Sequence, residues 1–257
     1  MHKLGLKLWS INTDFYLAEA VRLYNKGVYD YIELYVVPET LNTLEKWKKL
    51  KIPFIIHNAH FAQGFNLAKK EKEERNLEIY SQTKQFADEL DAKYIIFHGG
   101  IDGDIKETAR QLANLNEPRA LIENKPFVAL PNRMGGNFCR GYNSGEIKLV
   151  QDATGCGFCL DFVHAICAAN SLKRDVFKHI SDFFELNPQM FHLTDVNDIT
   201  SIYDSHPHLN EGELDLKQII SLIPDEKYVT LETNKNSKEN LDDFIVDCDI
   251  FRQNVFS

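Results

Sequence analysis

The sequence contains no run of eighteen or more apolar residues, and its first ten residues, MHKLGLKLWS, lack the apolar stretch of a secretory signal. A membrane-spanning helix needs about twenty apolar residues in succession, and a signal peptide needs a shorter apolar segment of its own. We therefore expect a soluble protein that does not span a membrane and works in the cytoplasm.

Cysteine is also scarce. The chain has five cysteines, an odd number in 257 residues, which does not suit a disulfide framework, and we expect all of them to be reduced. Cys156 and Cys159 form a CxxC pair, but a zinc site built on such pairs needs a second one, which the sequence lacks. We expect this pair to have a packing role. The remaining cysteines are Cys139, Cys167 and Cys248.

Basic residues are outnumbered. The 29 Lys and Arg against 38 Asp and Glu give a net charge of −9, which argues against a generic basic surface for nucleic acid. The count misleads, however, if bound divalent cations neutralise some of the carboxylates. Charge alone therefore does not exclude an anionic substrate.

What the sequence does have is a regular series of short apolar runs rich in β-branched and aromatic residues. Eight such runs cover residues 3–10, 29–37, 53–59, 94–100, 120–127, 157–164, 190–196 and 228–234. Amphipathic segments with helical spacing lie between them, for example residues 14–27, 76–91 and 172–187. This alternation predicts parallel strands joined by helices.

Eight strand and helix units in 257 residues, with no Pro/Gly/Ser-rich linker, predict an α/β fold with one domain. We expect a single (β/α)8 TIM barrel over residues 1–257. The longest stretch without periodicity, residues 128–146, follows the fifth predicted strand, and we expect it to form a loop that faces the substrate.

Metal-competent side chains stand at or near the carboxyl ends of six consecutive predicted strands, the third to the eighth. In a barrel these ends converge on one face, where active sites are built. A loop hydrogen bond would explain any one of them, but such bonds do not select His, Asp and Glu six times in succession. Imidazoles and carboxylates together suit zinc, manganese or iron. The residues are His57, His98, Glu123, Asp161, His164, His192 and Glu232, with Asp204, His206 and His208 after the seventh strand.

Asp161 and His164 lie three residues apart where the sixth strand ends. Residues three apart on an extended strand face opposite sides, so we expect Asp161 to point into the barrel and His164 to lie in the loop layer, on separate ions. The full set also exceeds the four or five ligands that one zinc takes. We therefore expect two or three ions.

With these motifs the chain resembles the endonuclease IV-type apurinic/apyrimidinic (AP) endonucleases, within the wider xylose isomerase-like barrels, over essentially its whole length. The similar motifs are IIHNAHFAQGFNLA, FHGG, IEN, CLDFVH, FHLTD, DSHPHLNEG and LET. In the first motif His57 directly ends the strand, whereas His60 matches the family by its spacing to NLA, and we favour His57. The resemblance implies one ion on His57, His98 and Glu123, a second on Glu123, Asp161, His192 and Glu232, and a third on His164, Asp204 and His206.

The chain also departs from the family. CLDFVH lacks the usual Asp-Thr-Cys-His, HLTD replaces His-Leu-Asn-Asp, and DSH lacks a basic residue between Asp and His. The segments FAQGF and VVPETLNTLEKW, where the family has the loops that penetrate DNA, offer weak wedges. The sequence thus indicates metal chemistry more strongly than DNA binding.

The leading hypothesis is a zinc-dependent phosphodiester hydrolase that acts at abasic sites in DNA, with Glu123, Asp161 and Glu232 as its catalytic carboxylates and manganese or iron as alternative metals. The alternative is a sugar or sugar phosphate isomerase or epimerase of the same superfamily, in which one ion on Glu123, Asp161, His192 and Glu232 polarises a carbonyl group. That alternative leaves His57 and His98 without a role. A third hypothesis is a catalytically inactive barrel that uses metal for binding.

Further positive or hydrogen-bonding groups lie near the expected site. His60, Lys125, Arg133 and Arg140 are candidates for contacts with the substrate, and the alternative for the three charged residues is that they are solvated loop charges. We expect His208 to be a supporting residue or a spare ligand beside His206, and we expect His2 and His179 on the surface. An expected position or role has then been given for all nine histidines of the sequence.

Overall fold

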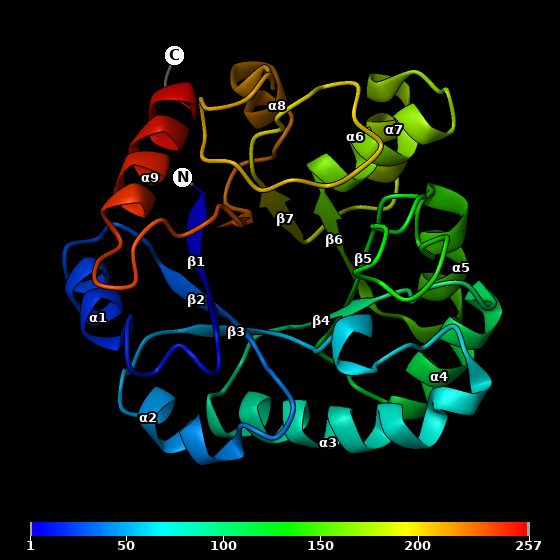
Figure 1. Ribbon diagram of the computed structural model, residues 1–257, viewed down its shortest axis with the longest axis horizontal. Coiled ribbons are helices and arrows are strands. Elements are labelled where there is room, and N and C mark those ends of the chain that lie inside the picture. Colours follow the sequence, from blue (N-terminus) through cyan, green and yellow to red (C-terminus); the bar gives the residue numbers. More distant parts are fainter. Residues whose placement is uncertain (1, 256–257) are drawn as a thin grey trace.

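The computed structural model describes residues 2–255, and they form one closed barrel of eight parallel strands surrounded by helices (Figure 1). Each strand pairs with the next, and β8 pairs with β1 to close the ring. The predicted (β/α)8 barrel is confirmed. The extent of the single domain, residues 1–257, stays a prediction, because residues 1 and 256–257 lie outside the described residues.

All eight predicted runs contain a strand. The strands are β1 (Lys3–Trp9), β2 (Tyr31–Tyr35), β3 (Phe54–His57), β4 (Ile95–His98), β5 (Ala120–Glu123), β6 (Gly157–Asp161), β7 (Met190–Leu193) and β8 (Tyr228–Leu231). The helices are α1 (Leu17–Asn25), α2 (Leu44–Lys48), α3 (Glu73–Glu89), α4 (Ile105–Leu115), α5 (Ser144–Thr154), α6 (Phe162–Ser171), α7 (Val176–Phe184), α8 (Leu216–Ser221) and α9 (Asp242–Val255). Short 3-10 helices are η1 (Leu41–Thr43), η2 (Phe61–Gln63) and η3 (Lys70–Lys72).

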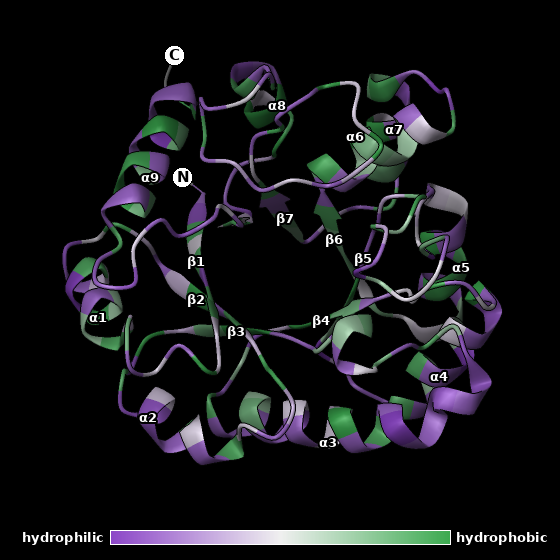
Figure 2. Cartoon of the chain, viewed as in Figure 1, coloured by the Kyte–Doolittle hydropathy of each residue, from purple (hydrophilic) through white to green (hydrophobic). Residues whose placement is uncertain are grey.

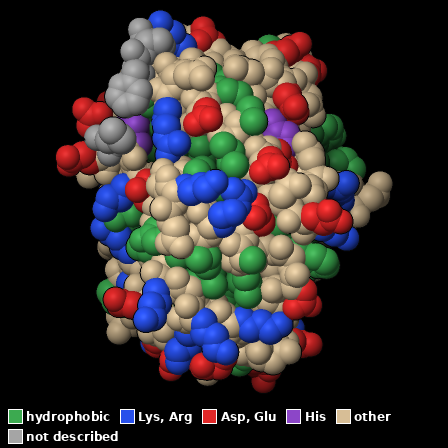
Figure 3. All heavy atoms as spheres, turned by 90° about the vertical axis from the view of Figure 1, so that its left-hand side faces the viewer, with side chains coloured by type: hydrophobic (Ala, Val, Ile, Leu, Met, Phe, Trp, Pro, Cys, Tyr) green, Lys and Arg blue, Asp and Glu red, His purple; other side chains and the backbone are tan. Residues whose placement is uncertain are grey.

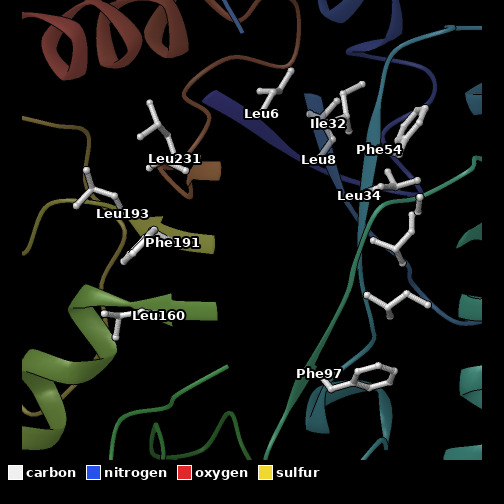
Figure 4. Packing of buried hydrophobic residues seen from close by; sticks show 14 of the residues in the cluster. Leu6, Leu8, Ile32, Leu34, Phe54, Phe97, Leu160, Phe191, Leu193 and Leu231 are labelled. Carbon is white, nitrogen blue, oxygen red and sulfur yellow. The ribbon is translucent and has the colours of Figure 1, made fainter. Parts of the chain in front are cut away.

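The main core lies between the strands and the helices. Alternate strand residues point away from the barrel axis, and they are apolar because the helices cover them. The helices in turn carry both hydrophobic and hydrophilic residues (Figure 2), as expected of helices with one buried side. Figure 4 shows part of this cluster, with Leu6, Leu8, Ile32, Leu34, Phe54, Phe97, Leu160, Phe191, Leu193 and Leu231 labelled.

The residues that point toward the barrel axis form two layers. The lower layer, at the amino-terminal side, is apolar, so the barrel is a packed core and not a pore. Its six buried members are Tyr31, Ile55, Ile96, Leu121, Cys159 and Met190, and Tyr94 and Tyr228 pack against them. The upper layer opens at the carboxyl ends of the strands, which we call the mouth of the barrel.

Side-chain caps start several helices immediately after the mouth. Asp104, Asn143 and Asp161 each accept a hydrogen bond from a backbone N–H in the first turn of the following helix. Such caps fix where each strand-to-helix loop ends, and with it the position of the strand end. No helix in the described part of the chain is long and apolar enough to cross a membrane.

Residues 128–143 form a loop that is attached to the loop after β4, and the last three residues of the predicted loop 128–146 belong instead to the first turn of α5. Asp102 accepts hydrogen bonds from the backbone N–H groups of Asn137 (3.0 Å) and Phe138 (3.1 Å), and the Arg140 guanidinium donates to the Gly103 carbonyl (2.8 Å). The two loops approach so closely that a Cβ at Gly99 would lie 2.5 Å from the Arg140 carbonyl oxygen. A glycine is therefore needed there.

Two expectations about single residues meet different outcomes. All five cysteines have free thiols, as expected. The surface position predicted for His179 is wrong, because the side chain lies on the inner side of α7, only 2% exposed, and Nε2 donates to the Tyr142 carbonyl (3.1 Å). His2 is half-buried against Phe251.

Candidate metal centre

Strand geometry alone brings the predicted ligands together. His57, His98, Glu123 and Asp161 are the last residues of β3, β4, β5 and β6. His98 and Glu123 are direct cross-strand neighbours, as are Asp161 and His192. Neighbouring strands lie about 4.8 Å apart, so the side chains of such pairs reach a common point in the mouth.

Glu123 is the hub of the cluster. Its carboxylate is 1% exposed, and Oε2 lies 3.2 Å from Nε2 of His57 and 3.0 Å from Nε2 of His98. His57 Nδ1 lies 2.9 Å from the Asn58 carbonyl oxygen, which only accepts, so Nδ1 carries the proton and Nε2 has its lone pair free. The donor atoms of His57, His98 and Glu123 all lie within 4.8 Å of one another.

A second set shares Glu123. Donor atoms of Glu123, Asp161 and His192 also lie within 4.8 Å of one another. His192 Nδ1 is 3.1 Å from Glu232 Oε1, 3.7 Å from Glu123 Oε2 and 3.9 Å from Asp161 Oδ2. Glu123 is thus placed between two candidate sites, in the arrangement that the family resemblance implies.

The remaining three predicted ligands lie around Asp204 and adjoin the Glu123 cluster, because His164 Nδ1 is 3.0 Å from Glu123 Oε1. Asp204 Oδ2 lies 3.2 Å from His164 Nε2 and 3.0 Å from His206 Nε2. His206 Nδ1 donates to the Glu232 backbone carbonyl (3.1 Å), which leaves Nε2 free as a ligand. The Lys125 ammonium, however, lies 3.1 Å from the same His164 nitrogen that an ion would use.

Asp161 and His164 are closer than expected. We expected them in different layers, but His164 Nδ1 lies only 3.4 Å from Asp161 Oδ2. The strand ends at Asp161 and α6 begins at Phe162, so the two residues are related by a helical turn and not by the pleat of a strand. Asp161 Oδ1 also caps that helix by accepting from the His164 backbone N–H (2.8 Å).

The electrostatics of the mouth favour divalent cations. Five carboxylates lie in the mouth with three ammonium groups, those of Lys7, Lys125 and Lys235, and the side chains of Glu33, Glu123, Asp161 and Lys125 are buried. Among the described residues, His192 Nδ1 and Asp204 Oδ1 are buried and form no hydrogen bond. Excess buried carboxylate beside an unpaired imidazole nitrogen fits zinc, manganese or iron. The five carboxylates are Glu33, Glu123, Asp161, Asp204 and Glu232.

The same crowding shifts the pKa values of the protein without metal. Burial alone would raise the pKa of Glu123, but Lys125 and the surrounding imidazoles hold it well below its usual range. Burial raises the pKa of Asp161. Although burial opposes it, Asp161 and Asp204 raise the pKa of His164 to about 10, and Asp204 raises that of His206 to about 9. Metal binding at these imidazoles must therefore displace protons.

Sequence analysis missed two residues of the cluster, Lys7 and Glu33. The Lys7 ammonium pairs with Glu33 and lies 2.6 Å from Glu232 Oε1. Glu33 is fully buried, and its Oε2 lies 2.9 Å from His192 Nε2. The sequence does contain a sign of Glu33, because it is a charged residue inside the apolar run YIELY. A charge buried in such a run needs a partner.

The other predicted contact residues divide into two groups. His60 lines the cavity of the mouth, and its Nδ1 accepts from the Ala62 backbone N–H (3.1 Å), whereas Nε2 of His57 lies 3.2 Å from Glu123 Oε2. Lys125 and Arg133 also line the cavity. Arg140 is instead bonded to Gly103 and Glu146 outside it.

The supporting role predicted for His208 beside His206 is wrong. His208 Nδ1 donates to Asp247 Oδ2 (2.8 Å), which also accepts from the Thr233 hydroxyl (2.6 Å). Asp247 is fully buried in α9 and needs these donors. His208 therefore attaches the loop after β7 to the last helix.

The cavity above the cluster has a volume of about 880 Å³. Aromatic side chains form one wall, and Trp9, 41% exposed, packs on Tyr35 with ring centroids 4.8 Å apart. The tip of the 128–143 loop contributes Leu130, Arg133 and Met134 to the opposite side. A sugar or a single nucleotide fits a cavity of this size.

Comparison of the sequence with known proteins identifies the family of the chain. The sequence model of a family described as xylose isomerase-like TIM barrel matches residues 26–252. The chain belongs to this family. The match confirms the resemblance inferred from the strand-end motifs.

The curated proteins and solved structures that resemble this chain carry two kinds of names. The curated protein "Probable endonuclease 4" of Halothermothrix orenii is 26% identical over 215 residues, 76% of each chain. The crystal structure of endonuclease IV from Thermus thermophilus has a TM-score of 0.70 at 18% identity and covers 99% of both chains. A D-tagatose 3-epimerase-like protein has a TM-score of 0.72 at 16% identity and covers 99% of this chain and 97% of its own. These likenesses support the fold but not one activity.

Proposed function

We propose that the protein is a metal-dependent hydrolase that cleaves phosphodiester bonds at abasic sites in DNA. The observation that carries the proposal is the position of Glu123, whose carboxylate lies within ligand distance of His57 and His98 and also belongs to the set of Asp161 and His192. A carboxylate shared in this way is what a pair of ions requires.

Two divalent ions at these residues would supply Lewis-acid chemistry, namely activation of a water molecule and neutralisation of phosphate charge. Glu123 holds the two sets together, and Asp161 and Glu232 add the negative charge that retains the ions. Lys125, which is buried at the floor of the cavity, and Arg133 at its rim are positioned to contact phosphate oxygens.

The substrate part of the proposal rests on the named relatives and on the cavity. An abasic nucleotide is less costly to extrude than an intact one because it has no base to unstack, and the cavity has room for it. The protein's net charge is −9, and on the flank shown in Figure 3 Lys and Arg lie among Asp and Glu. We therefore expect weak, salt-sensitive binding to DNA.

The test is cleavage of a duplex with one tetrahydrofuran abasic site at low salt, with the undamaged duplex as the matched substrate. We expect a single nick at the lesion, loss of cleavage with chelator, recovery with zinc or manganese, and little binding to undamaged DNA. The Glu123→Gln protein is the control for a contaminating nuclease. Equal cleavage by wild type and this variant would contradict the proposal.

A specific observation favours a second candidate, a sugar or sugar phosphate isomerase or epimerase. Lys125 lies at the His164 nitrogen that the third ion would need, and Glu123, Asp161, His192 and Glu232 alone suffice for one ion. A panel of ketoses and aldoses under the same metal conditions separates the two candidates. Sugar interconversion without nicking, with metal content near one per chain, would replace the hydrolase by the isomerase.

A further inference from the structure

The side chains of Lys7, Glu33 and Glu232 form a closed ring with the imidazole of His192 on one side of the mouth. Lys7 contacts Glu33 and Glu232, Glu33 contacts His192, and His192 returns to Glu232. They come from β1, β2, β7 and the end of β8, so the ring spans the seam where the barrel closes. Lys7 and Glu33 are direct cross-strand partners.

The ring decides which nitrogen of His192 faces the candidate metal site. Glu33 Oε2 lies 2.9 Å from Nε2, and an ionised carboxylate only accepts, so Nε2 carries a proton. Nδ1 is thereby directed toward the oxygens of Glu232, Glu123 and Asp161. A carboxylate on the far nitrogen of a ligand histidine fixes its tautomer and its orientation.

Glu33 is itself held rigidly. The Thr230 hydroxyl donates to Glu33 Oε2 (2.6 Å), and because its proton is used there, that hydroxyl accepts from the Tyr31 hydroxyl (2.8 Å). Tyr31 belongs to the buried lower layer. Glu33 therefore receives an ammonium, a hydroxyl and an imidazole, which together offset the cost of burying its charge.

Lys7 forms ion pairs with two carboxylates, those of Glu33 and Glu232. Its ammonium neutralises Glu33 and also lies 2.6 Å from Glu232 Oε1, the oxygen that is 3.1 Å from His192 Nδ1. Glu33, His57 and Glu232 could by spacing hold an ion of their own. Lys7 binds two of these three residues, so a protein cation takes that position.

We propose that Glu33 and Lys7 are positioning residues of the metal centre: Glu33 presents Nδ1 of His192, and Lys7 fixes the carboxylates of Glu232 and Glu33. The inference rests on the metal centre of the proposed function but not on its substrate. It applies equally to a hydrolase and to an isomerase.

The first test measures zinc binding to the metal-free protein by calorimetry. Glu33→Gln replaces an acceptor by an amide that can donate to Nε2 of His192. Nε2 then has the free lone pair, and Nδ1, which faces the candidate metal site, carries the proton. We expect the substitution to weaken one zinc site by roughly 10- to 100-fold, the usual loss for a partner of a ligand histidine. Glu33→Asp keeps the charge and should recover part of the loss. Lys7→Met should weaken the same site, and Lys7→Arg should restore it.

The matched control is Glu117→Gln. Glu117 is also a buried carboxylate, paired with Arg119 and Tyr80, but it lies in the loop before β5, at the opposite end of the barrel from the mouth. This variant should bind zinc like wild type. A general loss of packing would weaken zinc binding in both carboxylate variants, whereas a change in the tautomer of His192 would weaken it only in Glu33→Gln.

The second test is nitrogen-15 NMR of the imidazole of His192 in the zinc-loaded protein, assigned with His192→Gln. We expect a proton on Nε2 and zinc on Nδ1 in wild type, and loss of this pattern in Glu33→Gln. Zinc on Nε2, or unchanged zinc affinity in both Glu33→Gln and Lys7→Met, would overturn the inference. If wild type binds no zinc, manganese or iron at all, the proposed metal centre fails and this inference fails with it.

Discussion

The two layers inside the barrel are built from the same strands yet have opposite chemistry. On five strands an apolar residue of the lower layer is followed, two positions later, by a predicted ligand of the upper layer. The pairs are Ile55 and His57, Ile96 and His98, Leu121 and Glu123, Cys159 and Asp161, and Met190 and His192. The pleat points both members of a pair toward the axis, one under the other.

The lower layer therefore contributes to the stability of the barrel, and the upper layer carries the groups for its chemistry. The lower layer gains free energy from burial of apolar surface, whereas the upper layer confines like charges that repel each other without cations. Substitutions in the lower layer should therefore change folding and spare metal binding. Substitutions in the upper layer should do the reverse.

The largest effect is expected for Glu123→Gln. Its loss removes the carboxylate common to both sets of ligands, and we expect metal-dependent activity to fall by more than the roughly 100-fold typical of an outer partner. The circular dichroism spectrum should stay that of a folded barrel. Wild-type turnover with full metal content would show that Glu123 is not a shared ligand.

The second effect tests the lower layer directly below the ligand His192. Met190→Ala leaves a hole in a fully buried position, and we expect a loss of about 2–5 kcal/mol in the free energy of unfolding. Urea denaturation measures the change, and elemental analysis should find the same metal content as in wild type. Loss of metal at unchanged stability would mean that the two layers are not independent.

The third effect is a pH dependence of the metal-free protein. Asp204 raises the pKa of His206 to about 9 from an ordinary value of 6.5, so the stabilisation from this pair is fully present below pH 6.5 and is lost as pH rises toward 9. We expect the free energy of unfolding to fall over this range in the presence of chelator. Zinc affinity should instead rise with pH, because zinc needs the deprotonated imidazole. Asp204→Asn should flatten the first trend.

The smallest effect, on metal content, is expected for His60→Ala. The variant His57→Ala serves as its comparison. His57 faces Glu123, whereas His60 bonds to its own loop, so the His57 variant should lose one metal and the His60 variant should lose none. Metal content of the purified proteins decides. The opposite outcome would make His60 the ligand from the first motif.

The sequence predicted the barrel and all eight strands because each strand carries its own local pattern. It also indicated which candidate ligands would lie together, since parallel strand ends must meet. It could not indicate that Asp161 and His164 would be neighbours, because that depends on where α6 begins, a matter of one residue. Lys7 and Glu33 were missed because their partners, Glu232 and His192, are more than 150 residues away in the chain. Burial of His179 likewise depended on a distant loop.

The contact between Lys7 and Glu232 joins residues 225 positions apart, across the seam between the first and the last strand. Closing so long a loop costs more conformational entropy than pairing two neighbouring strands. The set of donors that includes Glu232 is complete only when β8 has paired with β1, whereas His57, His98 and Glu123 end three consecutive strands and meet without that closure. The two candidate sites therefore differ in how much of the barrel each one needs: the first needs three strands, and the second needs the whole ring.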